Sequence, residues 1–476
     1  MTRRLRAPAA ALLATALVAL ASCERTSGPP PSVLLIVIDT LRADHVGAYG
    51  YERPTTPNLD ALAARGTRFA SARASSSWTL PSVASIMTGL YPAVHGADHS
   101  DAALSADAAT MAAAFRDAGY ETAAFSANPA FVAAPQGIAN GFDQFRVLHG
   151  APAEPRALGA IPGDASMKNW VMQASAEEVT SAAGQWLARR QKKLETRPFF
   201  LYLHYFDPHA AYTPPARFAL RFGVAEDDPL RGDAQWPFLL ADQAPAPDVL
   251  ATLVKLYDAE IAATDAALGT LFEGPARELG DSTIVVVTAD HGEEFGDHGG
   301  VQHGRTLFDE LLHVPLILAG PGLPRGSVVA TTVSLTGLWS TISDLAGTGA
   351  PPTGNHSQVE PSFRPAIDGH EAGHAIFADL EARYAKDHQQ HRRALIDGNW
   401  KLLLDPERGS QLFDLASDAG EHRERGEADR ERQSSMRSRI LERDAVAATR
   451  RSIAPPKQII LDPARREQLK SLGYLQ

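Results

Sequence analysis

Two acidic residues and a histidine stand directly after apolar runs of the sequence, where they could hold a divalent metal. Asp39 and Thr40 follow the run VLLIVI at 33–38, and Asp290 and His291 follow TIVVVTA at 283–289. Runs of this kind predict strands buried on both faces of a parallel sheet. Ligands gather at the carboxyl ends of such strands. A lone Asp after a strand more often caps a helix or a turn, but the two together, with an adjacent imidazole, indicate a metal site.

A third polar cluster, WTLPSVASIMTG at 78–89, carries two hydroxyl side chains that could act as a nucleophile. Its pattern predicts a loop containing Pro81, followed by a short helix that ends at Gly89. A hydroxyl at a helix N-terminus faces unpaired N–H groups, which suit an anion. Thr79 or Ser82 could therefore be the nucleophile, or either could simply cap the helix.

The elements around these clusters predict an α/β fold with a mostly parallel central sheet flanked by helices. Strands are expected at 33–39, 199–206, 283–289 and 314–319, with helices at 58–66 and 249–272. Stretches rich in Pro, Ala and Gly at 151–165 and 210–248 indicate surface insertions.

The texture of the sequence changes near residue 350. A Gly- and Pro-rich linker at 347–362 precedes short strand-like pieces within 375–404 and a mixed-charge helix at 421–451, expected to be solvated. We therefore predict a catalytic domain over 33–349 and a smaller C-terminal α+β subdomain over 350–476.

Composition limits the classes of protein that the chain can belong to. Of 476 residues 44 % are hydrophobic, which excludes wholesale disorder, and the net charge of −11 argues against nucleic-acid binding. The single cysteine excludes an internal disulfide framework and a Cys-based zinc site.

That cysteine lies at the end of a predicted export signal. A basic start at 1–6 and an apolar stretch at 9–21 are followed by Ser22 and Cys23, and the apolar stretch is too short to span a bilayer. The sequence LASC at 20–23 resembles a bacterial lipobox, although an ordinary signal with a chance cysteine would look the same. We expect a signal peptide over 1–22, lipidation of Cys23 and a tether over 23–32. The protein would then be lipid-anchored in the bacterial cell envelope, on the periplasmic or outer-membrane face.

The ordered motifs of the chain resemble the sulfatase family of the alkaline phosphatase superfamily. The matching segments are DTLRAD at 39–44, YGY at 49–51, TTPNLD at 55–60, PSVASIMTG at 81–89 with YP and HG after it, FDPH at 206–209, ADHGEE at 289–294, GDHG at 296–299, VPLI at 314–317, and WKL, LFDL and LGY toward the end. The resemblance implies a sulfatase-like catalytic domain with a C-terminal subdomain.

Departures from the family pattern affect the nucleophile and the metal. Alignment places Thr79 at the formylglycine position and Val83 at the signature arginine. Because threonine carries a methyl group on Cβ, no formylglycine is expected. Thr40 and His291 replace the family's second Asp and its Asn, so Asp39, Thr79, Asp290 and His291 resemble the one-metal site of threonine-nucleophile relatives such as phosphoethanolamine transferases and nucleotide phosphodiesterases. The imidazole favours Zn or Mn, with Ca or Mg possible.

The resemblance also implies roles for side chains around the metal. His209 would protonate the leaving oxygen. His303 falls near the family's anion-binding lysine, and Asn128, His95 and Arg42 could add donors to the anion. Alternatively, Asp207, His209, His298 and His303 could complete a second metal site, as in two-metal phosphodiesterases.

We expect a metal-dependent hydrolase of sulfuric or phosphoric esters, in which Thr79 attacks the tetrahedral anionic centre. The substrate would be an anionic ester, either a small molecule or a glycan; no oligomeric state is predicted. Two alternatives are a transferase of phospho-substituents in the envelope and a non-catalytic binder of sulfated or phosphorylated glycans. The presence of Asp39, Asp290 and His291 argues against the binder.

Overall fold

The computed structural model describes residues 29–149, 174–241, 243–277, 282–349, 359–370, 373–381, 391–453 and 455–460, with residues 463 and 466. Cys23, the predicted signal peptide, most of the tether and the insertion at 151–165 lie outside the described residues. Within the described part of the chain, no helix combines the length and the apolar character needed to cross a membrane.

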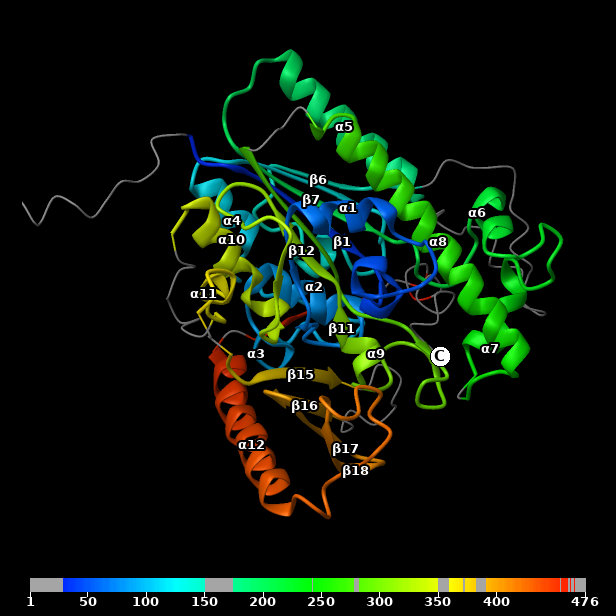
Figure 1. The fold of residues 1–476 in the computed structure, drawn as a ribbon. Coiled ribbons are helices and arrows are strands. Elements are labelled where there is room, and N and C mark those ends of the chain that lie inside the picture. Colours follow the sequence, from blue (N-terminus) through cyan, green and yellow to red (C-terminus); the bar gives the residue numbers. More distant parts are fainter. Residues whose placement is uncertain are drawn as a thin grey trace, which may run out of the picture. The chain divides into compact units, whose positions relative to one another are not determined.

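An eight-stranded sheet forms the centre of the catalytic part of the chain (Figure 1). Its strands lie in the order β13 (Ser327–Val329), β2 (Thr67–Phe69), β12 (Leu316–Ala319), β8 (Thr283–Ala289), β1 (Ser32–Ile38), β7 (Phe199–Tyr205), β5 (Glu121–Ser126) and β6 (Gln144–Val147). The strands from β8 to β6 are parallel, and β12 runs antiparallel to both of its neighbours. The predicted mostly parallel α/β fold is confirmed.

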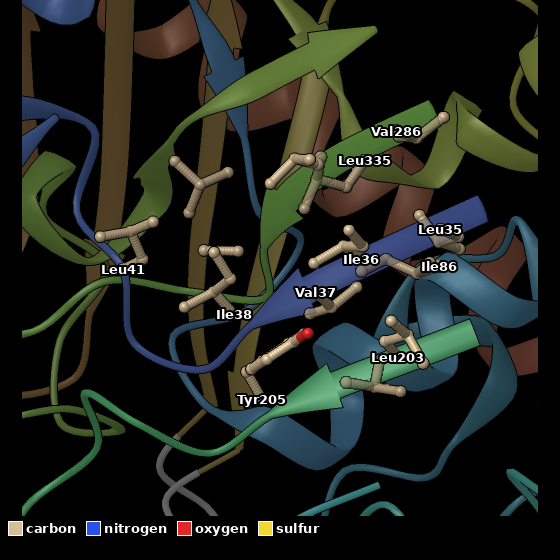
Figure 2. Packing of buried hydrophobic residues seen from close by; sticks show 14 of the residues in the cluster. Leu35, Ile36, Val37, Ile38, Leu41, Ile86, Leu203, Tyr205, Val286 and Leu335 are labelled. Carbon is tan, nitrogen blue, oxygen red and sulfur yellow. The ribbon is translucent and has the colours of Figure 1, made fainter. Parts of the chain in front are cut away.

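Strand β1 is the central strand for the candidate site, because it pairs with β7 on one side and β8 on the other. Ile38 is in register with Tyr205 and with Ala289. The residues that follow these strands therefore emerge at one edge of the sheet, as the sequence predicted. All but the first residue of β1 and all of β7 are buried, and Figure 2 shows their side chains packed with Ile86 and Leu335.

Helices surround the sheet. They are α1 (Pro57–Arg65), α2 (Thr79–Thr88), α3 (Pro92–His95), α4 (Met111–Asp117), α5 (Ala176–Lys192), α6 (Ala216–Arg221), α7 (Trp236–Leu239), α8 (Pro247–Glu273), α9 (Asp309–Leu312), α10 (Leu338–Ala346) and α11 (Arg364–Ile367). Helices α5 and α8 pack side by side, and α10 contacts both α2 and β1 (Figure 1).

Two predicted elements differ from the structure at prolines. The single strand expected over 314–319 is two strands, β11 (His313–Val314) and β12, which belong to different sheets on either side of Pro315. Proline lacks the N–H that a continuous ladder needs. Helix α2 begins at Thr79, so Pro81 lies in its first turn rather than in a loop. Proline is tolerated there because the first N–H groups of a helix have no intrahelical partner.

Short strand pairs complete the catalytic part. Strand β11 pairs with β3 (Ala72–Arg73), which also pairs with β14 (Val333–Ser334). Strands β9 (Glu294–Phe295) and β10 (Val301–Gln302) form a hairpin soon after Asp290. Strand β4 (Ala102–Ala103) pairs with β19 (Lys457–Gln458).

The C-terminal subdomain is a four-stranded antiparallel sheet with one long helix, as expected for an α+β unit. Its strands are β15 (Ile376–Glu381), β16 (His391–Asp397), β17 (Trp400–Asp405) and β18 (Gly409–Asp414), followed by α12 (Arg430–Ile453). The helix begins nine residues later than predicted, and it is not solvated all round. Met436 and Ile440 pack against Leu395, Leu402 and Leu412 of the sheet.

Candidate metal and nucleophile site

Asp39, the first residue after β1, presents its two carboxylate oxygens to different partners. Its side chain is fully buried. Oδ2 accepts a hydrogen bond from Asn128 Nδ2 at 2.9 Å and lies 3.3 Å from His204 Nε2. Oδ1 lies 3.5 Å from His291 Nε2. One oxygen of Asp39 is thus fixed by neighbouring strands, and the other faces His291.

Asp290, the first residue after β8, is divided in the same way. Its Oδ1 accepts the N–H groups of His291, at 3.0 Å, and Thr40, at 3.3 Å. Its Oδ2 is buried, makes no hydrogen bond to any residue that the structure describes, and lies 3.7 Å from His291 Nε2. Burial raises the pKa of Asp290 well above its ordinary value, and the carboxylate of Asp39 raises it further. Carboxylate oxygens of Asp39 and Asp290 lie within 4.8 Å of each other, and two buried negative charges at this distance are stabilised by a cation between them.

His291 has the tautomer that a metal ligand needs. Its Nδ1 lies 2.8 Å from the carbonyl oxygen of Gly292. A carbonyl can only accept, so Nδ1 carries the proton and Nε2 offers a lone pair. That lone pair faces the two carboxylates and lies 3.4 Å from Thr79 Oγ1.

The structure distinguishes between the two hydroxyls of the third cluster. Thr79 is the first residue of α2, is fully buried and contacts His291. Ser82 Oγ instead donates to the backbone carbonyl of Asp290 at 2.5 Å, so it secures the loop that carries Asp290. Thr79 is the hydroxyl that lies at the ligand cluster, and the N-terminus of α2 provides N–H groups beside it.

The donor set fits a divalent metal. Ligand atoms of Asp39, His204 and Asp290 all lie within 4.8 Å of one another, and this is the one such group of three or more among the described residues. His291 Nε2 and Thr79 Oγ1 stand beside the same carboxylates. His204 was not among the ligands predicted from the sequence. Burial lowers its pKa to about 4, so it is neutral at physiological pH.

His209 and His303 lie together, next to the ligand cluster. Their ring centroids are 4.9 Å apart, and the ring of His303 is 4.6 Å from that of His291. His209 Nδ1 donates to the carbonyl oxygen of Ala210 at 2.7 Å, which leaves Nε2 as the atom for proton transfer. Of the two predicted histidines, His303 lies beside the metal-ligand candidate His291, and His209 lies beside His303.

Glu293 is a site residue that sequence reasoning missed. Its Oε1 lies 2.9 Å from His303 Nδ1, and its Oε2 accepts a hydrogen bond from the Tyr212 hydroxyl at 3.0 Å. Its place in the acidic motif GEE two residues after His291 is the only sequence signal for this role.

Arg42 does not take the predicted role of anion donor. Its five N–H donors are all directed to protein oxygens: Nε and Nη2 to Asp44, Nη1 to the carbonyl of Glu293, and both Nη atoms to Asp297. A guanidinium has five donors, so none remains for a substrate.

His95 is also placed differently from the prediction. It is buried, and its Nε2 lies 3.2 Å from the carbonyl oxygen of Pro81 and 3.1 Å from Ser85 Oγ, while Nδ1 accepts the N–H of Ala97 at 3.0 Å. These contacts brace α2, and none of them is made to Asp39, Asp290 or His291. Asn128 donates to Asp39, so donation to an anion stays a prediction for it.

The alternative second metal site is not assembled. His298 pairs with Glu310 at 2.9 Å and stacks on Phe308, while Asp207 Oδ2 accepts the N–H of Ala176. Among the residues that the structure describes, the side chains of Asp207, His209, His298 and His303 do not form a group of candidate ligand atoms close enough to share a metal.

Comparison with known proteins agrees with this fold. A family model described as Sulfatase matches residues 31–348. The choline-sulfatase of Rhizobium meliloti is 28 % identical over 432 residues, which cover 82 % of this chain and 81 % of the relative. The phosphonate monoester hydrolase of Agrobacterium radiobacter superposes with a TM-score of 0.65 at 22 % identity, covering 91 % of this chain and 98 % of that chain. BT4656 in complex with its substrate D-glucosamine-2-N,6-O-disulfate gives a TM-score of 0.70 at 20 % identity, covering 88 % of this chain and 98 % of that chain.

The family match over this mostly parallel sheet places the chain among the ester hydrolases of the alkaline phosphatase superfamily. Within that class, the chain belongs to the sulfatase family. Enzymes of this family use a divalent metal, and the candidate ligands of this chain are those described above.

Proposed function

We propose that this protein hydrolyses sulfuric or phosphoric esters by attack of Thr79 on the sulfur or phosphorus atom. One observation carries the proposal: Thr79 Oγ1 lies 3.4 Å from the Nε2 atom of His291, which itself stands 3.5 Å from Asp39 and 3.7 Å from Asp290. A buried hydroxyl beside three metal-type ligands is the arrangement of an activated oxygen nucleophile.

Asp39 Oδ1, Asp290 Oδ2, His291 Nε2 and Thr79 Oγ1 would hold the metal, which when bound lowers the pKa of the hydroxyl and neutralises negative charge on the ester. Zn or Mn suits this set better than Ca or Mg. Each Asp has one oxygen occupied by N–H donors, so each offers a single oxygen. Ca²⁺ takes six to eight oxygen ligands, whereas an imidazole favours Zn and Mn.

The proposed reaction has two displacements, attack by Thr79 and hydrolysis of the threonine ester, and different residues of the chain assist each. Thr79 attacks as its alkoxide, the hydroxyl proton having passed to solvent, and its Oγ bonds to the central atom as the bond to the leaving oxygen breaks. The imidazolium form of His209 gives that oxygen its Nε2 proton and regains one from the water of the second displacement. Water hydrolyses the resulting threonine ester, which releases sulfate or phosphate and restores the hydroxyl. His303 and the N-terminal N–H groups of α2 bind the non-bridging oxygens, where negative charge develops.

Phosphoric esters are the better match within the proposed substrate class. The nucleophile is a plain hydroxyl, and metal-activated hydroxyls serve phosphoryl transfer elsewhere in the superfamily that the chain resembles. The similar proteins named above act on a sulfate ester or a phosphonate ester by their names, which supports both chemistries. A glycan ester is supported by the sulfated sugar in the BT4656 complex.

The test is a parallel assay of aryl sulfate, aryl phosphate and phosphodiester substrates with matched threonine variants. Thr79→Ala should lower turnover by at least about 1,000-fold, and Thr79→Ser should keep part of it, because serine retains the nucleophilic oxygen. Thr88→Ala is the control, since Thr88 lies on the same helix and its hydroxyl donates only to the carbonyl of Ala84. Turnover that survives in Thr79→Ala but falls in Thr88→Ala would refute the proposal, as would a purified protein that binds no divalent metal.

A further inference from the structure

His204 is a buried histidine whose role none of the proposed steps explains. It lies on β7, in register with Val37 of β1 and with Ser126 of β5, and it is fully buried. Its Nε2 is 3.3 Å from Asp39 Oδ2, and its Nδ1 is 3.0 Å from the hydroxyl of Tyr202. By distance alone it could be a further metal ligand or a donor to a metal ligand.

The two roles require opposite tautomers. As a metal ligand, Nε2 would offer a lone pair, Nδ1 would carry the hydrogen, and the Tyr202 hydroxyl would accept it. As a donor, Nε2 would carry the hydrogen to Asp39, and the Tyr202 hydroxyl would donate to Nδ1.

Tyr202 favours the donor role. Its hydroxyl is buried, and among the described residues its one hydrogen-bonding partner is His204 Nδ1. If Nδ1 held the hydrogen, the hydroxyl hydrogen would have no acceptor, which costs about 1–3 kcal/mol for a buried group. With the hydrogen on Nε2, the Tyr202 hydroxyl, both ring nitrogens of His204 and Asp39 Oδ2 each have a hydrogen-bond partner.

Asn128, two residues after the end of β5, supports the same assignment. Its Nδ2 donates to the same oxygen, Asp39 Oδ2, and its Oδ1 accepts the N–H groups of Ala130 and Phe131, which fixes the orientation of the amide. Two donors, His204 of β7 and Asn128 just after β5, thus converge on Oδ2, while Oδ1 is turned toward His291.

We infer that His204 is a positioning residue that donates from Nε2 to Asp39 Oδ2 and leaves Oδ1 as the single oxygen of Asp39 that contacts the metal. The inference rests on the metal site of the proposed function. It adds that the site has one imidazole ligand, His291. The hydrogen bonds that link Tyr202, His204 and Asp39 then set the affinity of the site for the metal.

X-ray absorption spectroscopy of the zinc-loaded full-length protein counts the imidazole ligands directly. We expect one imidazole in the wild type and one in His204→Gln. Two imidazoles in the wild type that fall to one in His204→Gln would overturn the inference while leaving the metal-dependent function intact.

Zinc affinity, measured by competition with a chelator, tests the positioning role through rescue. His204→Gln keeps an N–H donor of similar reach and should stay within about threefold of the wild type, whereas His204→Ala should bind zinc about 10–100-fold more weakly. The control is His313→Gln, since His313 lies outside the cluster and contacts the carbonyl of Ala70. Equal losses in His204→Gln and His204→Ala would count against a donor role. A wild type that binds no zinc and no manganese would instead remove the proposed function along with the inference.

Discussion

His303 Nδ1 and Glu293 Oε1 lie 2.9 Å apart, and both side chains are almost completely buried. Because Tyr212 holds the other oxygen of Glu293, the carboxylate cannot turn away, and the ring of His303 stays beside His291 and His209. The pair therefore fixes an imidazole beside the ligand cluster, where the proposed mechanism uses it to bind an ester oxygen.

Glu293→Gln keeps the shape of this contact but removes its charge, so we expect kcat to fall about 10-fold. His303→Gln should cost about 100-fold, because it removes the imidazole itself. Steady-state kinetics of both variants on an aryl phosphate check which substitution lowers kcat more, and circular dichroism verifies that both variants fold. A His303→Gln enzyme as fast as the wild type would contradict it.

The contribution of His209 to kcat should increase with the basicity of the leaving oxygen. Loss of a general acid slows departure of an alkoxide far more than departure of a nitrophenolate, which leaves without a proton. We expect His209→Asn to lower kcat about 100-fold on an alkyl ester and less than about fivefold on a p-nitrophenyl ester. Equal losses on the two substrates would indicate that His209 binds the anion instead.

His95 should make stability depend on pH. Burial lowers its pKa to about 3, so it is neutral in the folded protein above that value. The unfolded chain binds a proton below about pH 6.5, and in the window between the two pKa values it carries one more proton than the folded state. Stability contributed by this group is therefore present above pH 6.5 and lost as the pH falls toward 3, by up to about 1.4 kcal/mol per pH unit.

Replacing His95 with glutamine retains a donor toward Pro81 but removes the titration. Denaturant unfolding between pH 4 and pH 7 should show that His95→Gln has a shallower pH dependence than the wild type. The same slope in both proteins would show that His95 does not titrate in this window.

Lys401 joins the C-terminal sheet to the catalytic part through a fully buried amine. Its Nζ lies 2.8 Å from Glu421 and 3.4 Å from Asp309 of α9. Lys401→Met would leave two buried carboxylates without that amine, and we expect a loss of about 3–5 kcal/mol in the free energy of unfolding. The exposed pair of Arg217 and Glu177 is the matched control, since removal of an exposed ion pair costs less than about 1 kcal/mol. Similar losses at the two pairs would show that the buried network is not stabilising.

The proposed envelope location depends on Cys23. If Cys23 is lipidated, a Cys23→Ser protein expressed in a Gram-negative host should move from the membrane fraction to the soluble fraction, while the catalytic part stays folded and active. Fractionation with immunoblotting and mass spectrometry of the mature N-terminus are the measurements. A wild-type protein that is found in the soluble fraction with no lipid on Cys23 would indicate an ordinary signal peptide instead.

Much of the fold and part of the site follow from local patterns. The buried strands and the polar residues just after them were predictable, because β-branched runs and strand ends leave a one-dimensional signal, as at Asp39 and Asp290. The roles of His204, Arg42 and His95 were not, because each depends on partners far away in sequence. In the sequence, His204 is a single polar residue within an apolar strand. Its role depends on the pairing of β7 with β1, which brings Asp39 beside it. Nothing near Arg42 in the sequence indicates Asp297, whose carboxylate accepts hydrogen bonds from both Nη atoms of the guanidinium.

The long-range pairing of β1 has a consequence for biosynthesis. Thr40 and Asp290, which the site brings into contact, are 250 residues apart in the chain, and Asp39 and His204 are 165 residues apart. A chain emerging from the ribosome therefore cannot complete the ligand cluster until β8 has been synthesised and has paired with β1. Metal binding at the proposed site therefore requires β8 to be in place, and a nascent chain cut short before residue 283 carries Thr79 but lacks Asp290 and His291.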